Sequence, residues 1–217
     1  MRPIKKQSQQ RPVSLASTAR KGGGNVRIIA GQWRRSLLPV ADAAGLRPTG
    51  DRIRETLFNW LAHFFGDFES LKGLDLFAGS GALGFELASR GAEHVTLIEK
   101  NRAIYQTLCK NRDKLHASTL NIVCDDALSF LSRDENFYDI IFIDPPFALN
   151  LHEATILVAL KHLSTGGLLY VEAPKEWRPE CLDRLNLEIL RESSAGNVTY
   201  RLVRPLETVK DDATSVP

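Results

Sequence analysis

The feature that most limits the fold is a short apolar strand near residues 73–77 that passes directly into a helix near 81–90. The turn between them contains Gly79, Gly81 and Gly84, which match the pattern G-x-G-x-x-G. Small residues at these positions allow a ligand to approach the backbone amides at the start of the helix. Glycine-rich turns also serve tight packing, so the surrounding sequence has to decide between the two interpretations.

The surrounding sequence alternates between strands and helices. The strands are continuous apolar runs, which is typical of a parallel sheet covered by helices on both faces. Two further strands, separated by a turn at 193–197, predict an antiparallel hairpin at one sheet edge. The expected parallel strands are 73–77, 95–98, 121–124, 139–143 and 168–172, the helices 81–90, 101–115, 126–132 and 152–163, and the hairpin strands 187–192 and 199–204.

The length and composition predict one main domain. A chain of 217 residues with 43% hydrophobic residues can bury a single core of ordinary size. The first residues are rich in Gln, Ser, Arg and Gly and contain few large apolar side chains, so we expect them to be disordered. The predicted organisation is a basic arm (1–24), a hairpin and helix (25–66), a Rossmann-like core (67–207) and a disordered tail (208–217).

Charge is distributed unevenly along the chain. Residues 1–60 contain twelve Lys and Arg against three Asp and Glu, whereas residues 61–217 contain sixteen against twenty-three. A basic segment joined to an acidic body favours contact with a polyanion, although a solvated tail is the alternative for residues 1–24. The three cysteines form no CxxC pair, and no apolar run approaches the ~18 residues of a membrane span, so we expect a cytoplasmic protein without a metal site.

Several basic residues precede the core. Strands near 26–29 and 36–40 predict a hairpin that carries Arg34, Arg35 and an exposed Trp33, which either stacks on a base or covers the domain. A helix is expected to start near Asp51 with a favourable capping pattern. The arginines near its start suit phosphate contacts, and salt bridges to the acidic body are the alternative: Arg47, Arg52 and Arg54.

Acidic residues follow or interrupt the first three strands of the core. Glu99 ends the second strand, where a carboxylate can accept hydrogen bonds from both hydroxyls of a ribose, and Asp126 follows the third strand. Either acid could instead cap the following helix. Asp75 lies inside the first strand, where aspartate is unfavourable and requires a partner. An NAD enzyme gives no reason for Asp75, whereas an acid there can face the cationic methionine end of S-adenosylmethionine.

The fourth strand runs into Asp144-Pro145-Pro146-Phe147. The two prolines remove backbone donors and stiffen the chain, which leaves carbonyl acceptors in a fixed loop at the carboxyl edge of the sheet. Asp144 and the Pro145 carbonyl can each accept one N–H of an exocyclic amino group while Phe147 stacks on the base. Positioning of this kind supplies most of the acceleration in methyl transfer to an amine. A rigid turn without chemistry is the alternative.

Four blocks in order resemble one known family, the RsmD-type bacterial 16S ribosomal RNA guanine-N2 methyltransferases, within the class I methyltransferases that share a D/N-P-P-F/Y motif. The blocks are 27–34, 45–61, 75–84 and 144–147, and the similarity covers roughly residues 26–205. Gly50 departs from the family, which more often has a hydroxyl residue there, and the long N-terminal extension is not explained by the resemblance.

The resemblance implies a seven-stranded, mostly parallel sheet with an antiparallel C-terminal hairpin and a small N-terminal hairpin and helix. It implies a bacterial monomer that uses S-adenosylmethionine to methylate a guanine of 16S ribosomal RNA, within an assembled particle. The expected cofactor contacts are Asp75, Phe77, Ala78, Gly79, Ser80, Gly81, Glu99, Lys100, Asp126 and Ala127, and the base-holding loop is Asp144, Pro145, Pro146 and Phe147. The expected RNA contacts are Arg34, Arg35, Arg47, Thr49, Arg52 and Arg54.

Two alternatives remain open at this point. The Asp-Pro-Pro-Phe loop recognises an amino group and not a particular base, so DNA adenine and protein glutamine are possible acceptors; the basic N-terminal segment and the blocks before Asp75 favour RNA. A noncatalytic RNA-binding assembly factor could keep the same fold. The acids at Asp75, Glu99 and Asp144 argue against that alternative, because an inactive site need not retain them.

Overall fold

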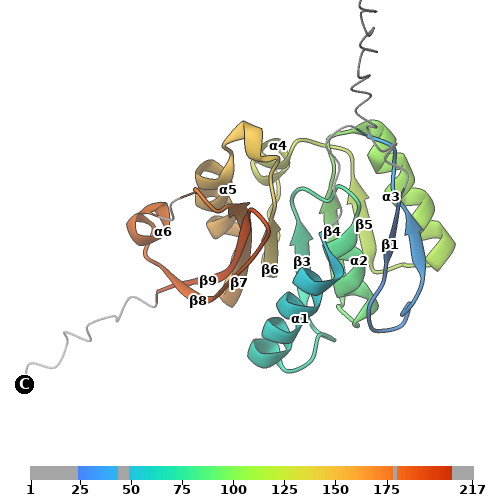
Figure 1. Cartoon of the computed structure of the whole chain (residues 1–217), viewed down its shortest axis with the longest axis horizontal. Coiled ribbons are helices and arrows are strands. Elements are labelled where there is room, and N and C mark those ends of the chain that lie inside the picture. Colours follow the sequence, from blue (N-terminus) through green and yellow to red (C-terminus); the bar gives the residue numbers. More distant parts are fainter. Residues whose placement is uncertain (1–23, 44–48, 178–179, 207–217) are drawn as a thin grey trace, which may run out of the picture.

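A seven-stranded sheet forms the centre of the molecule (Figure 1). The structure is a computed structural model, and it describes residues 24–43, 49–177 and 180–206. The spatial order of the strands is β5-β4-β3-β6-β7-β9-β8, and β9 alone runs antiparallel to its neighbours. The predicted sheet is therefore confirmed. The strands are β3 (Lys72–Asp75), β4 (His94–Ile98), β5 (Leu120–Val123), β6 (Tyr138–Ile143), β7 (Leu163–Pro174), β8 (Leu187–Ala195) and β9 (Val198–Pro205).

The four predicted crossover helices are present within a few residues of their expected bounds. They are α2 (Ala82–Ser89), α3 (Arg102–Leu115), α4 (Ala127–Leu131) and α5 (His152–Ala159), the last extended by the 3-10 turn η2 (Leu160–His162). The predicted helix at the N-terminal side is α1 (Asp51–Phe65). Two short elements were not expected, α6 (Glu180–Arg184) and the 3-10 turn η1 (Phe147–Leu149), because neither is long enough to show a helical period in the sequence.

The chain order places a crevice at the carboxyl edge of the sheet. From β3 the chain moves outward through β4 to β5 and then returns to the other side of β3 as β6. The crossovers on the two sides of β3 therefore leave in opposite directions. In open α/β sheets a ligand binds at the carboxyl ends of the strands where the order reverses. The glycine turn after β3 and the Asp144 loop after β6 lie at this position.

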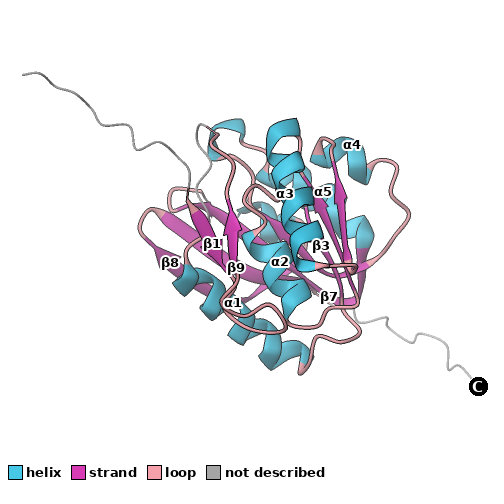
Figure 2. Ribbon diagram, turned by 90° about the vertical axis from the view of Figure 1, so that its right-hand side faces the viewer, coloured by secondary structure: helices cyan, strands magenta, loops and turns pink. Residues whose placement is uncertain are grey.

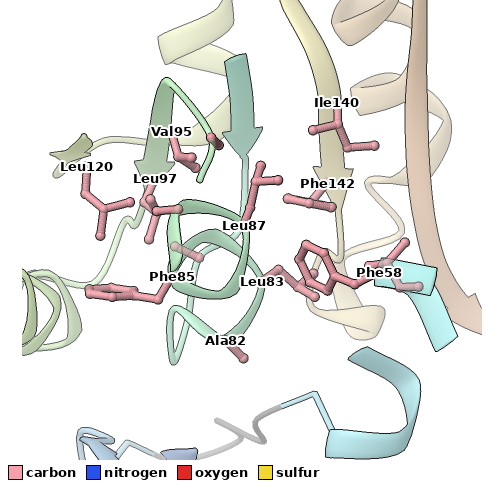
Figure 3. Packing of buried hydrophobic residues seen from close by; sticks show 14 of the residues in the cluster. Phe58, Ala82, Leu83, Phe85, Leu87, Val95, Leu97, Leu120, Ile140 and Phe142 are labelled. Atoms are coloured by element: carbon pink, nitrogen blue, oxygen red, sulfur yellow. The ribbon is translucent and has the colours of Figure 1, made fainter. Parts of the chain in front are cut away.

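Each face of the sheet is covered by helices and carries its own core. On one face α1, α2 and α3 pack on the strands, and Figure 2 shows α2 and α3 in front of the sheet. Figure 3 shows Leu87 of α2 beside Phe142 of β6, whereas Phe85 lies on the side of Leu97. On the other face α4, α5 and α6 enclose a second core. Burial of both faces explains why the strands do not alternate between apolar and polar residues.

The N-terminal hairpin belongs to the first core. Its strands are β1 (Asn25–Arg27) and β2 (Leu37–Pro39), close to the predicted ranges. Trp33 in the connecting turn is only 9% exposed, and its backbone amide donates to the Ser89 hydroxyl at 3.0 Å. The prediction of an exposed aromatic is therefore wrong, and the alternative in which Trp33 covers the domain is confirmed, because the indole contributes to the core between the hairpin and the domain.

A fully buried glutamate holds this hairpin on the domain. The carboxylate of Glu86, in α2, accepts the backbone amides of Ile29 and Ala30 at 2.8 and 3.0 Å. It also accepts Arg54 Nη1 at 3.1 Å and Arg90 Nε at 2.9 Å. Four donors therefore satisfy one buried carboxylate and connect the hairpin, α1 and α2.

Arg54 completes this arrangement from α1. Its side chain is 1% exposed, and it donates to Asp51 Oδ1 at 2.6 Å and to the carbonyl oxygens of Arg27 at 2.8 Å and Thr49 at 3.3 Å, in addition to Glu86. Asp51 is the first residue of α1, but Gly50 occupies the N-cap position and no side chain caps the helix. The capping expected at Asp51 is therefore wrong, because its carboxylate is bound by arginines.

No helix among the described residues combines the length and the apolar character that crossing a membrane requires. The predicted arm and tail, residues 1–24 and 208–217, lie outside the described residues apart from Gly24.

Candidate active site

The glycine turn leads from β3 to α2. Gly79 and Gly81 have φ of +51° and +78°, a backbone conformation that glycine adopts without strain. A Cβ on Gly81 would also lie 2.7 Å from the Phe85 ring and 2.8 Å from Leu108. Sequence reasoning assigned these glycines to ligand approach, and the structure adds that Gly81 is required for packing beneath the turn. The other predicted turn residues are partly or fully buried: Phe77, Ala78 and Ser80.

Glu99 is fixed beside this turn. Its Oε2 accepts the Gly79 amide at 3.0 Å and its Oε1 accepts the Asn101 amide at 2.6 Å. Burial raises the pKa of the Glu99 carboxyl, and these amide bonds oppose the rise. The turn and the acid predicted to share a ligand therefore lie in direct contact.

Asp126 stands at the next strand end. It caps α4, accepting the amides of Leu128 at 3.2 Å and Ser129 at 3.3 Å, and Lys100 Nζ lies 3.0 Å from its Oδ2. The hydrogen bond with Lys100 lowers the pKa of the Asp126 carboxyl. The helix cap that the sequence left open is therefore present, the Asp126 carboxylate is partly exposed, and Ala127 is buried at the start of α4.

Asp75 is buried at the end of β3. The amide of Gly84, in α2, donates to its Oδ2 at 3.1 Å, which is the partner that an acid inside a strand requires. Desolvation raises the pKa of Asp75 to about 7, and repulsion by Glu99 contributes in the same direction. Asp75 therefore keeps its proton to a higher pH than an ordinary aspartate, and its ionised form gains from any cation that approaches.

The predicted base-holding loop leaves the sheet at Asp144. Pro145 is buried, Pro146 is exposed, and Phe147 is partly exposed at the start of η1. The pKa of the Asp144 carboxyl is raised well above its usual range, first by desolvation and then by the charges of Glu172 and Asp75. The loop thus presents a carboxyl with a strong tendency to hold a proton.

Three carboxyls gather on the same side of the sheet edge. They are Asp75, Asp144 and Glu172. Strand register pairs Asp75 with Phe142 and Phe142 with Tyr170, so the side chains of these paired residues lie on one face of the sheet. Two residues further along β6 and β7, Asp144 and Glu172 return to that face. The Tyr170 hydroxyl donates to Glu172 Oε2 at 2.8 Å in this buried corner.

Sequence reasoning missed Glu172, Tyr170 and His152. Glu172 interrupts the apolar strand β7 as Asp75 interrupts β3, and this signal could have identified it. The His152 ring is buried, 6.1 Å from the Phe147 ring and 5.3 Å from the Trp177 ring, and its Nε2 lies 3.0 Å from the Glu172 carbonyl oxygen. An isolated histidine gives no sequence pattern that would predict this position.

The basic residues are more dispersed than predicted. Arg34 and Arg35 are exposed, but their turn packs at Ser89, at the opposite end of α2 from the glycine turn. Arg52 is exposed on the first turn of α1 and Thr49 is partly exposed, whereas Arg47 lies outside the described residues. A phosphate contact for Arg54 is wrong for this structure, because the guanidinium is buried and bound to Glu86.

The described residues contain no group of three or more His, Cys, Asp and Glu arranged to hold a metal ion. The acids at the sheet edge are held by backbone amides, by Lys100 and by a tyrosine hydroxyl instead. The arrangement suits an organic ligand with hydroxyls and a positive charge, next to a loop that accepts hydrogen bonds.

Comparison with known proteins gives a consistent result. The family model described as "Conserved hypothetical protein 95" matches residues 26–204. A relative named Ribosomal RNA small subunit methyltransferase D, from Escherichia coli K12, is 45% identical over 194 residues, covering 88% of this chain and 96% of its own. The Haemophilus influenzae relative of the same name is 43% identical, covering 82% of this chain and 93% of its own.

Solved structures share the fold. The Escherichia coli protein yhhF has 46% identity and a TM-score of 0.72, covering 83% of this chain and 97% of its own. A precorrin-6y C5,15-methyltransferase from Geobacter metallireducens has 19% identity and a TM-score of 0.60, with 76% and 92% covered. The second likeness extends to the fold alone.

Proposed function

The chain belongs to the protein family described as "Conserved hypothetical protein 95", and from this membership we propose that it is an S-adenosylmethionine-dependent methyltransferase acting on the exocyclic amino group of a guanine in 16S ribosomal RNA. The names of the 45% and 43% identical relatives support small-subunit ribosomal RNA as the substrate. One observation carries the chemistry: the glycine turn fixed by Glu99 and the Asp144 loop occupy the ends of the adjacent strands β3 and β6.

The residues at the carboxyl edge fit S-adenosylmethionine. Both oxygens of Glu99 are held by backbone amides, so the carboxylate is already oriented to accept ribose hydroxyls. The left-handed backbone at Gly79 and Gly81 lets a ligand approach the start of α2. Asp75 adds negative charge for a cationic methionine end, and Asp126 offers a further acceptor. When bound, this cofactor supplies a methyl group carried by a positively charged sulfur.

The Asp144 loop would hold the acceptor. The exocyclic amino group has a lone pair delocalised into the base, so its two N–H bonds have to be oriented before the nitrogen can react. The Asp144 carboxylate and the Pro145 carbonyl can each accept one N–H, and Phe147 can stack on the base. The nitrogen becomes acidic only when it gains its new carbon, and the nearby Asp144 carboxylate can then take the released proton. Positioning is therefore the main contribution of these residues.

RNA contacts are proposed at the exposed basic residues. Arg34, Arg35 and Arg52 are exposed and can meet phosphates, and Arg47 and Thr49 precede the start of α1 in the sequence. DNA adenine and protein glutamine remain rival acceptors for the same loop, and the relatives' names favour ribosomal RNA over both. We further propose that the protein acts as a monomer on an assembled particle in the bacterial cytoplasm.

The test is transfer of labelled methyl from S-adenosylmethionine to small ribosomal subunits prepared without their modifications, followed by nucleoside analysis. We expect N2-methylguanosine at one site, and less transfer to free 16S RNA than to the particle. Asp144→Ala should lower turnover by at least ~100-fold with cofactor affinity nearly unchanged. Asp183→Ala, on the exposed surface of α6, is the matched control. Methylated adenine or glutamine, or cofactor binding without transfer to any RNA, would contradict the proposal.

A further inference from the structure

Glu172 lies directly behind the base-holding loop. It follows Val171, which pairs with Ile143, the residue before Asp144. Asp144 and Glu172 are thus the next residues after the last paired position of β6 and β7, and the Glu172 charge acts on the Asp144 carboxyl. Glu172 is 7% exposed, and the Tyr170 hydroxyl binds its Oε2 at 2.8 Å.

The backbone of the same residue holds the other end of the loop. The Glu172 carbonyl oxygen lies 3.0 Å from His152 Nε2, which requires the proton on that nitrogen. The His152 ring packs against Phe147 on one side and Trp177 on the other. Burial lowers the pKa of His152, which favours the neutral ring, and the Glu172 carbonyl favours the tautomer with the proton on Nε2. Glu172 therefore acts on both ends of the loop: its charge acts on Asp144, and its carbonyl oxygen holds the His152 ring that packs against Phe147.

From this geometry we infer that Glu172 is a positioning residue that shares a proton with Asp144 and thereby sets the pH range in which the loop accepts an amino group. The inference rests on the proposed function for its catalytic meaning. The sharing of a proton between Asp144 and Glu172 does not depend on the substrate and can be measured in the protein without RNA. A buried carboxyl and a half-buried carboxyl beside it do not both ionise readily, so one proton is held between them until the pH rises.

The groups around Glu172 strengthen this sharing. Asp144 faces it from β6, Asp75 stands on β3 beyond Asp144, and Tyr200 pairs with it from β9. Tyr170 stabilises the ionised form of Glu172 through its hydroxyl. The charges of Glu172 and Asp75 both raise the pKa of Asp144, so removal of the Glu172 charge must lower it.

The direction of this change in the Asp144 pKa gives the expected result. The ionised Asp144 accepts an amino N–H more strongly than the neutral carboxyl does, and only the ionised form can take the released proton. The value of kcat/KM should therefore rise with pH along an acid limb that reports the Asp144–Glu172 pair. Glu172→Gln keeps the size and an oxygen acceptor for Tyr170 but removes the charge. The acid limb of kcat/KM should move to lower pH by about one unit. The plateau value of kcat/KM at higher pH should stay within ~10-fold of that of the unmodified protein. A role in folding alone would lower the plateau without moving the limb.

Tyr170→Phe gives an independent variant. Without the hydroxyl the pKa of Glu172 rises, so Glu172 keeps the shared proton and Asp144 ionises at lower pH. The acid limb should again move to lower pH, although the Glu172 carboxyl itself is still present in this variant. Glu188→Gln is the matched control, because Glu188 is a glutamate of β8 with 42% side-chain exposure, paired with Arg204 at the surface.

The experiment combines two measurements. The first is the pH profile of methyl transfer to unmodified small subunits at saturating S-adenosylmethionine, for the four proteins. The second is carbon-13 NMR titration of the Asp144 carboxyl in the RNA-free protein, assigned with Asp144→Asn. We expect two coupled steps in the unmodified and Glu188→Gln proteins, and one step at lower pH in Glu172→Gln. An unchanged Asp144 titration would overturn the inference, whereas the expected titration without methyl transfer would overturn the proposed function only.

Discussion

The buried pair of Arg54 and Glu86 provides the sharpest test of the fold. Arg54→Met removes one charge from a pair whose side chains are 1% and 0% exposed. Breaking a buried pair in this way costs about 3–5 kcal/mol, because the remaining charge loses its partner. Arg90 Nε still binds Glu86 at 2.9 Å, which places the expected loss near the lower end, about 3–4 kcal/mol. For a chain of this length the melting temperature should fall by about 6–16 °C.

Urea denaturation measures this loss directly. The midpoint should fall with an unchanged slope, since the surface exposed on unfolding stays the same. Arg184→Met is the matched control: its partner is Glu153, both side chains are more than half exposed, and the loss should not exceed about 1 kcal/mol. The double variant Arg54→Met/Glu86→Gln should lose less than the two single variants added together, because it removes both charges of the buried pair. Arg90 loses its partner Glu86 in this variant, but the Arg90 side chain is 16% exposed and reaches water.

The alternative role of Arg54 was a phosphate contact, and the same variant separates the two roles. A structural role predicts reduced unfolding free energy, with RNA affinity unchanged under conditions where the protein stays folded. Reduced RNA affinity together with an unfolding free energy within about 0.5 kcal/mol of the original would refute the reasoning.

Three further predictions concern the site and the arm. Asp75→Asn should abolish a rise in cofactor affinity between pH 6 and 8, measured by calorimetry; the unmodified protein should show it, because a carboxyl with a pKa of about 7 ionises in this range and attracts a cation. Gly81→Ala should cost about 2–4 kcal/mol in denaturant and weaken cofactor binding, since φ is +78° and the new Cβ meets Phe85, and an unaffected protein would contradict the packing argument. Deletion of residues 1–24 should lower RNA affinity and flatten its salt dependence, and identical salt slopes would make the arm a passive tail.

The buried acids also link stability to pH. Asp75 has a folded pKa near 7 against an ordinary value of 3.8, so its neutral form is favoured by folding. The stability that Asp75 contributes is fully present below pH 3.8 and is lost as the pH rises toward 7, by about 4 kcal/mol in total. Asp144 and Glu172 shift in the same direction. The site is therefore held ready for a cation at a cost in stability near neutral pH.

The sequence predicted the sheet and the strand-end residues well, because both depend on local pattern. Continuous apolar strands between glycine and acid signals specify a parallel sheet, and the carboxyl ends of its strands share one edge. Asp75 and Asp144 could be identified because aspartate next to an apolar strand conflicts with burial. Glu172 shows the same conflict within β7, yet it carries no accompanying turn or proline pair to draw attention.

The misassigned residues depended on long-range contacts. A basic residue at a helix start looks the same whether it faces solvent or an acid 32 positions away, as Arg54 faces Glu86. Trp33 likewise sits in a basic turn whose partner, Ser89, lies 56 residues further along. The buried Glu86 was the available signal, because glutamate inside the apolar helix α2 requires a partner from elsewhere.

The position of the Arg34-Arg35 turn has a consequence for the size of the substrate. This turn and the glycine turn stand at opposite ends of α2, whose eight residues span about 12 Å. An RNA that meets both must reach across the helix while one base enters the Asp144 loop. A single nucleoside or a very short oligonucleotide would fill only the loop, so selection of one guanine would depend on a folded RNA surface and not on the identity of the base alone.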